Sequence, residues 1–220
     1  KLIQSGRSAD ASPFMVLLAA YAAVLARHAT QEEVVIGSPV AGRDQRELEP
    51  LIGYFVNPLP LRIDLGKNPR FTELVARTRD QVLAAYAHQS LPFQQIVEAI
   101  APPRDPARPA LFQTMLIFQN QTSDPLPPPG FSLEPWLPRT GPARSDLDFY
   151  VWQRAERLEG YCLYNSDIFE REEINRFMVR LQTFLKSALE SPDQPVATLK
   201  FDETFSLPGL GSRRRPPSGS

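Results

Sequence analysis

The residue types best suited to acid–base or nucleophilic chemistry are scarce in this sequence: it has two histidines, His28 and His88, and one cysteine, Cys162. A general base needs an orienting partner and a nucleophile nearby, and neither histidine has such residues at a diagnostic spacing. Sequences of the types GxSxG, GxxxxGKS/T, GxGxxG and HExxH are absent. Each histidine ends a predicted helix, where a cation stabilises the helix dipole. We therefore predict no catalytic residue and no metal ligand.

Three pairs of carboxylates are candidates for acid–base work: Glu32 with Glu33, Asp146 with Asp148, and Glu172 with Glu173. Solvated surfaces or helix starts explain the first and third pairs. The middle pair alternates with an apolar residue on a predicted strand, so both acids share one face. We interpret that face as solvent-exposed rather than as an acid–base site. The lone cysteine lies in an apolar strand and is interpreted as a small buried hydrophobe.

The composition is that of a globular protein, and it argues against several functions. Hydrophobic residues make up 42% of the 220 residues, and the formal net charge of −1 leaves no basic excess for nucleic acid. The longest apolar stretch, residues 13–26, is shorter than the roughly 18–20 residues that a membrane helix needs, and no secretory signal precedes it. One cysteine excludes an internal disulfide and fits a reducing compartment, so we expect a cytoplasmic protein without membrane contact.

Apolar periodicity predicts the helices. The first is apolar nearly all round, which indicates deep burial, and has Asp10 or Ser12 as its cap and Pro13 in its first turn. A second helix starts at Asn68, with an apolar face running to residue 86. A shorter helix covers residues 91–100, and Ser166 or Asp167 caps a long last helix.

Short apolar runs predict strands at residues 34–40, 52–64, 111–119, 131–133, 147–153 and 158–164. Proline cannot donate to a sheet ladder, so Pro58 and Pro60 predict that the second run lies at a sheet edge or bulge. The last two runs are predicted to form a hairpin, and residues 196–201 a docked extension. Because the order is not a regular alternation of strands and helices, we predict an α/β fold of the mixed-sheet sandwich type.

Proline usage suggests how the chain is organised. Of 23 prolines, 11 lie between residues 101 and 150, and the segment 121–142 is expected to be an extended connection. Residues 206–220 are linker-like in composition, rich in glycine, serine and proline. We therefore predict one folded unit over residues 1–205 and a flexible linker or tail over residues 206–220. The sequence starts without Met and enters a helix pattern almost at once, which suggests a fragment of a longer protein.

Four segments match known sequence patterns in order: QEEVVIGSPVAGR at 31–43, IGYFVNPLPLR at 52–62, HQSLPFQ at 88–94 and RDPARPALF at 104–112. Together they resemble the carboxy-terminal half of nonribosomal peptide synthetase condensation domains, in the chloramphenicol-acetyltransferase-like superfamily. The resemblance covers roughly residues 10–205. Departures from the family pattern fall at Pro58, Ser90, Gln94 and Ala107, and in Pro109–Ala110. LIFQN at 116–120 differs from the FNYLG-like residues of epimerisation domains, which favours condensation.

This resemblance implies one lobe of a two-lobe pseudodimer that joins carrier-bound thioesters through a peptide bond. The family's HHxxxDG lies in the amino-terminal half and is absent here, so the chain is expected to be inactive alone. The implied partners are an amino-terminal condensation lobe, donor and acceptor carrier proteins and a neighbouring adenylation domain. No cofactor is expected to bind directly, because the substrates are carried on phosphopantetheine. The alternative is a non-catalytic module that docks carrier proteins, which the departures at Ser90, Gln94 and Ala107 would permit.

The candidate site residues are polar groups expected to line the substrate tunnel or support the contact between lobes. Asn57 is both a donor and an acceptor, suited to a thioester, an amide or the pantetheine arm. Arg62 is expected to pair with an acid or orient a tunnel loop, with a plain surface role as the alternative. The remaining candidates are Ser38, Gln113, Gln119 and Ser145.

Overall fold

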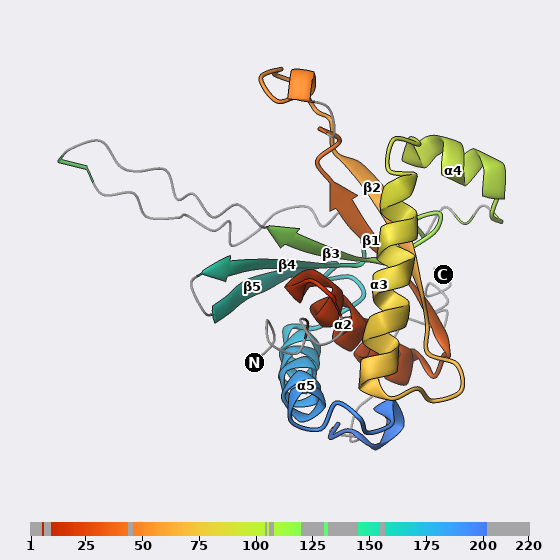
Figure 1. The fold of residues 1–220 in the computed structure, drawn as a ribbon, viewed down its shortest axis with the longest axis vertical. Coiled ribbons are helices and arrows are strands. Elements are labelled where there is room, and N and C mark those ends of the chain that lie inside the picture. The colour runs from red at the N-terminus through yellow and green to blue at the C-terminus, as the bar shows by residue number, and fades with distance from the viewer. Residues whose placement is uncertain are drawn as a thin grey trace, which may run out of the picture.

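The computed structural model describes residues 6, 10–43, 46–103, 105, 108–119, 130–131, 145–154 and 157–201. Figure 1 shows the elements in the order α2 (Pro13–Ala29), β1 (Glu33–Val40), η1 (Arg46–Leu48), β2 (Asn57–Asp64), α3 (Phe71–Ala87), α4 (Phe93–Ile100), β3 (Thr114–Gln119), β4 (Leu147–Arg154), β5 (Arg157–Tyr164), α5 (Arg171–Glu190) and η2 (Val196–Thr198). The predicted extended connection at 121–142, the strand at 131–133 and the tail at 206–220 lie wholly or largely outside the described residues.

The five strands form one mixed sheet in the order β2-β1-β3-β4-β5. β1 pairs antiparallel with β2 and parallel with β3, while β4 pairs parallel with β3 and antiparallel with β5. The hairpin prediction is confirmed, with Arg154 opposite Arg157. β2 lies at the edge, as Pro58 and Pro60 predicted. The predicted mixed α/β fold is therefore confirmed.

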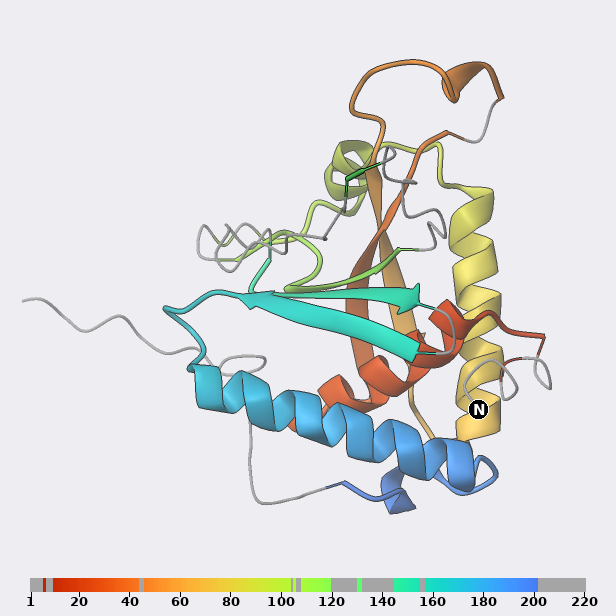
Figure 2. The same ribbon diagram turned by 90° about the vertical axis from the view of Figure 1, so that its left-hand side faces the viewer.

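Helices α2, α3 and α5 lie on one side of this sheet (Figures 1 and 2). Alternation along the strands divides the side chains between two faces. On β4, Phe149 and Val151 point toward the helices and are buried in the core. By the same alternation, Tyr150 and Trp152 belong to the opposite face. In the described part of the chain, no helix covers that opposite face over β3, β4 and β5.

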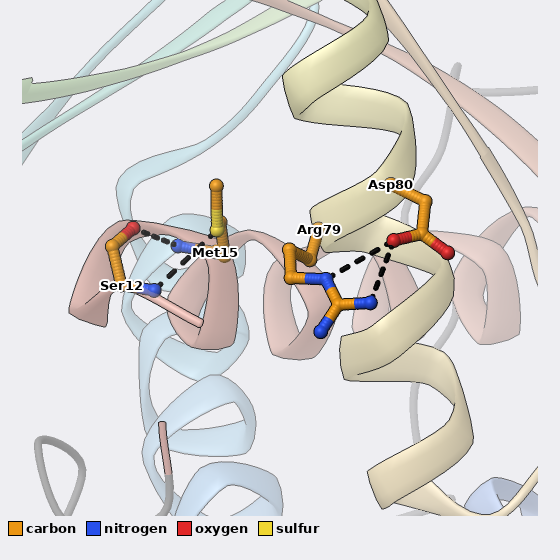
Figure 3. A network of polar contacts seen from close by, with 4 residues as sticks. All are labelled: Ser12, Met15, Arg79 and Asp80. Atoms are coloured by element: carbon orange, nitrogen blue, oxygen red, sulfur yellow. Dashed lines mark hydrogen bonds and ion pairs between the residues drawn. The ribbon is translucent and has the colours of Figure 1, made fainter. Parts of the chain in front are cut away.

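Helix α2 is buried around its whole circumference, as its sequence predicted. Every residue from Phe14 to Ala26 is at most 7% exposed. Its first turn is capped as expected: the Ser12 Oγ accepts from the Met15 N–H at 3.3 Å, and the Met15 Sδ accepts from the Ser12 N–H at 3.4 Å (Figure 3). Sulfur thus takes the place that a Glu or Gln oxygen has in the usual capping box. Thr30, at φ 52°, ends the helix.

Helix α3, in contrast, has one buried face, and its outer face carries polar pairs. Arg79 and Asp80 form an ion pair at 2.8 Å there (Figure 3). The two side chains follow one another in sequence and Asp80 is largely exposed, so the pair contributes little to stability. The described residues include no helix with both the length and the apolarity needed to cross a membrane.

The predicted start of the last helix is wrong. α5 begins at Arg171 behind the N-cap Glu170, whose N–H donates to the Glu173 Oε2 at 2.8 Å. Residues 166–168 form a turn instead, in which the Asn165 Oδ1 accepts from the Asp167 N–H at 3.0 Å. The side chain of Asn165 therefore stabilises a local turn that contains the serine and aspartate, since short polar side chains favour turns as well as helix caps.

The interpretation of His28 as a cation at a helix end is also wrong. Its side chain is 7% exposed, both ring nitrogens lack a hydrogen-bond partner among the described residues, and the ring lies 5.5 Å from that of Phe177. Burial, assisted by the charges of Arg180 and Arg27, lowers the pKa of His28 to about 4. The residue is therefore neutral at pH 7 and acts as part of the core. Its counterpart His88 ends α3 as predicted and is exposed.

The prediction that Asp146 and Asp148 share a solvent-exposed face is wrong. Asp148 is fully buried, and the Ser145 hydroxyl donates to its Oδ1. Burial raises the pKa of the half-buried Asp146, opposed by the charge of Arg108. Cys162 packs against the core as expected but is only partly buried, with its Sγ 3.3 Å from the Met178 Sδ. Burial, with Asp148 nearby, raises the pKa of Cys162 to about 12, so its thiol is unreactive at neutral pH.

The buried His28 makes stability depend on pH. The unfolded chain binds a proton on this residue as pH falls below its ordinary pKa of 6.5, whereas the folded chain does so only near pH 4. The free energy of unfolding should therefore fall by about 3 kcal/mol across that window from this residue alone. Urea denaturation at pH 7.5 and pH 4.5 measures the loss, and His28→Leu should lose less than the wild type. Equal losses in the two proteins would show that His28 is not buried as a neutral ring.

Candidate functional site

Asn57, one of the predicted site residues, lies at the start of β2 and is held by several hydrogen bonds. Its Nδ2 donates to the backbone carbonyls of Gln89 at 3.0 Å and Leu91 at 2.8 Å. Its Oδ1 accepts from the Phe93 N–H at 3.0 Å. One amide side chain thus ties the edge strand to the turn between α3 and α4. Both ends of the amide are engaged by the protein itself.

The loop at residues 41–56 joins β1 to β2 and extends beyond the sheet (Figure 1). Its chain direction is set at Gly42, where φ is +62° and an added Cβ would lie 2.1 Å from the Phe55 carbonyl oxygen. Arg43 organises the loop: its guanidinium donates to the carbonyls of Leu48 and Glu49 and lies 4.4 Å from the Phe55 ring centroid. Sequence reasoning did not single out Arg43, although it ends the first motif.

The far part of this loop presents apolar side chains to solvent. Ile52 is 103% exposed, Tyr54 75% and Leu51 49%. Scattered apolar residues on a surface are ordinary, but three on one projecting loop are characteristic of a contact surface. The loop thus combines an internally bonded base with an apolar tip.

Three other predicted residues lie in or beside the sheet, with Ser38 and Ser145 buried and Gln113 only partly buried. The Ser38 Oγ donates to the Leu116 carbonyl at 3.1 Å, joining β1 to β3. Ser145 donates to Asp148 as described above. The Gln113 Nε2 donates to the Pro109 carbonyl at 3.3 Å. These bonds hold neighbouring strands and the chain entering β3.

A buried hydroxyl chain runs close to these residues. The Tyr21 hydroxyl lies 2.6 Å from the Thr114 Oγ1, which donates to the Leu147 carbonyl at 2.8 Å. Because the Thr114 hydroxyl donates its one proton to the Leu147 carbonyl, the Tyr21 hydroxyl is the donor in its bond to Thr114. Burial raises the pKa of Tyr21 well above its usual value, so the phenol stays protonated. This chain links α2 to β3 and β4.

Arg62 and Gln119 lie on the surface. The Arg62 guanidinium pairs with the Glu33 carboxylate at 2.5 Å, and the two side chains are 70% and 43% exposed. Their hydrogen bond lowers the pKa of Glu33 and raises that of Arg62. An exposed pair of this kind contributes little stability. Arg62 therefore pairs with an acid, as one of the sequence expectations had it, while Gln119 is exposed at the end of β3.

The six candidates do not converge on one site. Gln113 and Ser145 come together at Leu147, whose N–H donates to the Gln113 carbonyl at 3.2 Å and whose carbonyl accepts from the Ser145 hydroxyl at 3.3 Å. The others lie on separate strands. A cavity of about 50 Å³ beside Gln31, Gln113 and Thr114 holds at most one or two waters. Among the described residues, no group of three or more histidines, cysteines and acids is arranged to hold a metal.

Comparison with known proteins places this geometry in a family. Residues 5–206 match the family model described as the condensation domain. The phosphinothricin tripeptide synthetase PhsB of Streptomyces viridochromogenes is 42% identical over 195 residues, which are 87% of this chain and 16% of that synthetase. Within a four-domain nonribosomal peptide synthetase bound to AMP and glycine, a similar fold has a TM-score of 0.83 at 20% identity, covering 93% of this chain and 17% of that one.

The X-domain from teicoplanin biosynthesis is also similar, with a TM-score of 0.81 and 29% identity over 91% of this chain. In a complex with OxyB, the X-domain matches at 30% identity with a TM-score of 0.78, over 90% of this chain and 44% of the domain. The chain spans 46% of the X-domain in the first of these structures and a much smaller share of the synthetase relative. The family match over most of the sequence and the identity to PhsB agree: the chain belongs to the condensation domain family.

Proposed function

We propose that this chain is the carboxy-terminal lobe of a condensation domain of the chloramphenicol-acetyltransferase-like superfamily, and that the complete domain forms peptide bonds in nonribosomal synthesis. The observation that carries the proposal is coverage: almost the whole chain matches, yet it spans 46% of the similar X-domain. The four ordered motifs assign it to the carboxy-terminal side. The sequence lacks HHxxxDG, so the complementary lobe supplies that motif.

The reaction proposed for the complete domain is aminolysis of a thioester. The amine nitrogen of the acceptor attacks the carbonyl carbon of the donor, the C–N bond forms, and the C–S bond breaks. The amine loses one proton in this step, and the sulfur that leaves on the donor's phosphopantetheine takes up one proton to become a thiol. The partners are therefore two carrier proteins, with an adenylation domain as neighbour, and the setting is the cytoplasm. We propose that the domain binds no cofactor directly, because the substrates are carried on phosphopantetheine.

The face of the sheet that α2, α3 and α5 leave open is proposed as the contact with the amino-terminal lobe. Tyr150 and Tyr161 are stacked there with centroids 4.8 Å apart, and Trp152 lies 5.8 Å from Tyr161. Aromatic side chains with polar tips are favoured at protein interfaces, where they supply large contact areas. The apolar tip of the loop at 41–56 is proposed as a further part of the contact.

Asn57 is proposed as a positioning residue at the tunnel wall. Its donors and acceptor already hold the turn between α3 and α4, so it fixes the backbone near the loop at 41–56 without contacting substrate. Ser38, Gln113 and Ser145 support the sheet in the same way through their bonds to the backbone or to Asp148. Arg62 and Gln119, both on the exposed side, are proposed to contribute to the interlobe surface.

A second candidate function is a docking module without chemistry of its own. The observation that favours it is the similarity to the X-domain, which forms a complex with OxyB. In this case the chain would bind carrier proteins with the same surface and would catalyse nothing, even with a complementary lobe.

Reconstitution distinguishes the two functions. The 220-residue chain is mixed with a separately produced amino-terminal condensation lobe that carries HHxxxDG, together with two loaded carrier proteins. Amide product, followed by mass spectrometry of the acceptor carrier, is expected only when both lobes are present, because each supplies one wall of the tunnel. Turnover by this chain alone would refute the lobe assignment, and carrier binding without product would favour the docking module.

Asn57→Ala tests the positioning role. The variant removes three hydrogen bonds at a partly exposed turn, so we expect a loss of about 2 kcal/mol in unfolding free energy, measured by urea denaturation. Asn57→Asp is the matched control: it keeps the acceptor for the Phe93 N–H but sets a carboxylate against the Gln89 and Leu91 carbonyls, and it should be no more stable than the alanine variant. A wild-type stability for Asn57→Ala would contradict the role.

A further inference from the structure

Helix α3 has only part of a side-chain cap at its N-terminus. The Glu73 Oε2 accepts from the N–H of the N-cap residue Arg70 at 3.0 Å, but the Arg70 side chain itself makes no cap bond. Helix starts leave N–H groups without intrahelical partners, and one of them here belongs to the buried Phe71. The Phe71 N–H donates to the Gln194 carbonyl at 3.2 Å, and the Thr72 N–H donates to the Pro192 carbonyl at 3.0 Å. The acceptors for these two N–H groups therefore come from a segment more than a hundred residues later.

That segment, residues 192–201, is here called the exit strap. It is bonded back to the chain entering α3 along its length. The Val196 N–H donates to the Pro69 carbonyl at 2.9 Å, and the Ala197 N–H donates to the Asn68 Oδ1 at 2.9 Å. Asn68 has a φ of 45° and Lys67 a φ of 68°. Two consecutive residues in the left-handed region are costly, so the contact with the strap compensates for backbone strain.

The end of the exit strap is fixed by an aromatic anchor, Phe201. The Arg27 guanidinium carbon lies 4.1 Å from its ring centroid and that of Arg180 lies 5.5 Å away. The His28 ring is 5.2 Å from the Phe201 ring. Arg27 also donates to the Leu199 carbonyl at 3.0 Å. The anchor thus joins the end of α2, the middle of α5 and the strap.

We propose that the exit strap and the first turn of α3 form one cooperative unit, a closure that opens and shuts as a whole and that Phe201 holds shut. The side chains of Val196 and Leu199 on the strap are buried, at 4% and 2% exposure, and the strap carbonyls accept from the Phe71 and Thr72 N–H groups of α3. Release of the anchor therefore frees the strap and uncaps α3 together.

Amide hydrogen exchange by NMR on the full 220-residue chain tests the closure, with Phe201→Ala as the main variant. Phe71, Thr72, Val196 and Ala197 are predicted to exchange at least tenfold faster than in the wild type, all by a similar factor. None of these four amides donates to the anchor, so a purely local contact would accelerate only the neighbouring Lys200 amide. Amides of the β1–β2 ladder should not change.

Two further variants keep the test decisive. Asn68→Gly retains the left-handed backbone but removes the acceptor for the Ala197 N–H, and it should accelerate the same four amides without touching the anchor. Leu83→Ala, at a 53% exposed position of α3, is the matched control and should leave them unchanged. For Phe201→Ala, acceleration confined to Lys200, unequal factors among the four amides, or equal acceleration of the β1–β2 ladder would each overturn the proposal. For Asn68→Gly, acceleration confined to Ala197 would do so.

Discussion

The complete burial of helix α2 is the constraint on which the rest of the structure depends. A helix apolar on all sides needs neighbours all round, and here the sheet lies on one side with α3 and α5 on the other. Burying one large apolar side chain contributes about 1.5–3 kcal/mol, so residues 14–26 provide much of the driving force for folding. Tyr21 adds a directional hydrogen bond to this apolar packing. Its hydroxyl bonds to Thr114 on β3, which fixes the position of α2 on the sheet.

Around that core, the ends and loops are held by side chains and carbonyls from distant parts of the sequence. Asn57 holds the turn after α3, Arg43 holds the loop at 41–56, and the exit strap caps the start of α3. Each gives partners to backbone groups, and leaving such groups unpaired is costly at buried positions such as Phe71. α3 is therefore tied at both ends, while one face of β3, β4 and β5 stays without helices in the described residues.

Local patterns predict those elements whose stability is local. The apolar spacing of α2 was sufficient to predict a buried helix, and the prolines of β2 were sufficient to predict an edge strand. Both signals act within one element, the first as periodicity and the second as a missing N–H. The neutral state of His28 depends first on its burial and then on the charge of Arg180, which is 152 positions later, and the burial of Asp148 depends on how β4 is covered. The acceptors for the Phe71 and Thr72 N–H groups could not be predicted either, because they lie on the exit strap. At the candidate site, the motifs identified Asn57, but only the structure assigns its three partners.

We propose that a complementary lobe covers the open face of the sheet. An NMR titration of the isotopically labelled chain with an unlabelled amino-terminal condensation lobe tests this contact. We expect a one-to-one complex whose shift changes centre on Tyr150 and Tyr161 and spare Val179, which is 60% exposed on α5. Absence of a complex, or changes centred on the outer side of α5 instead, would contradict it.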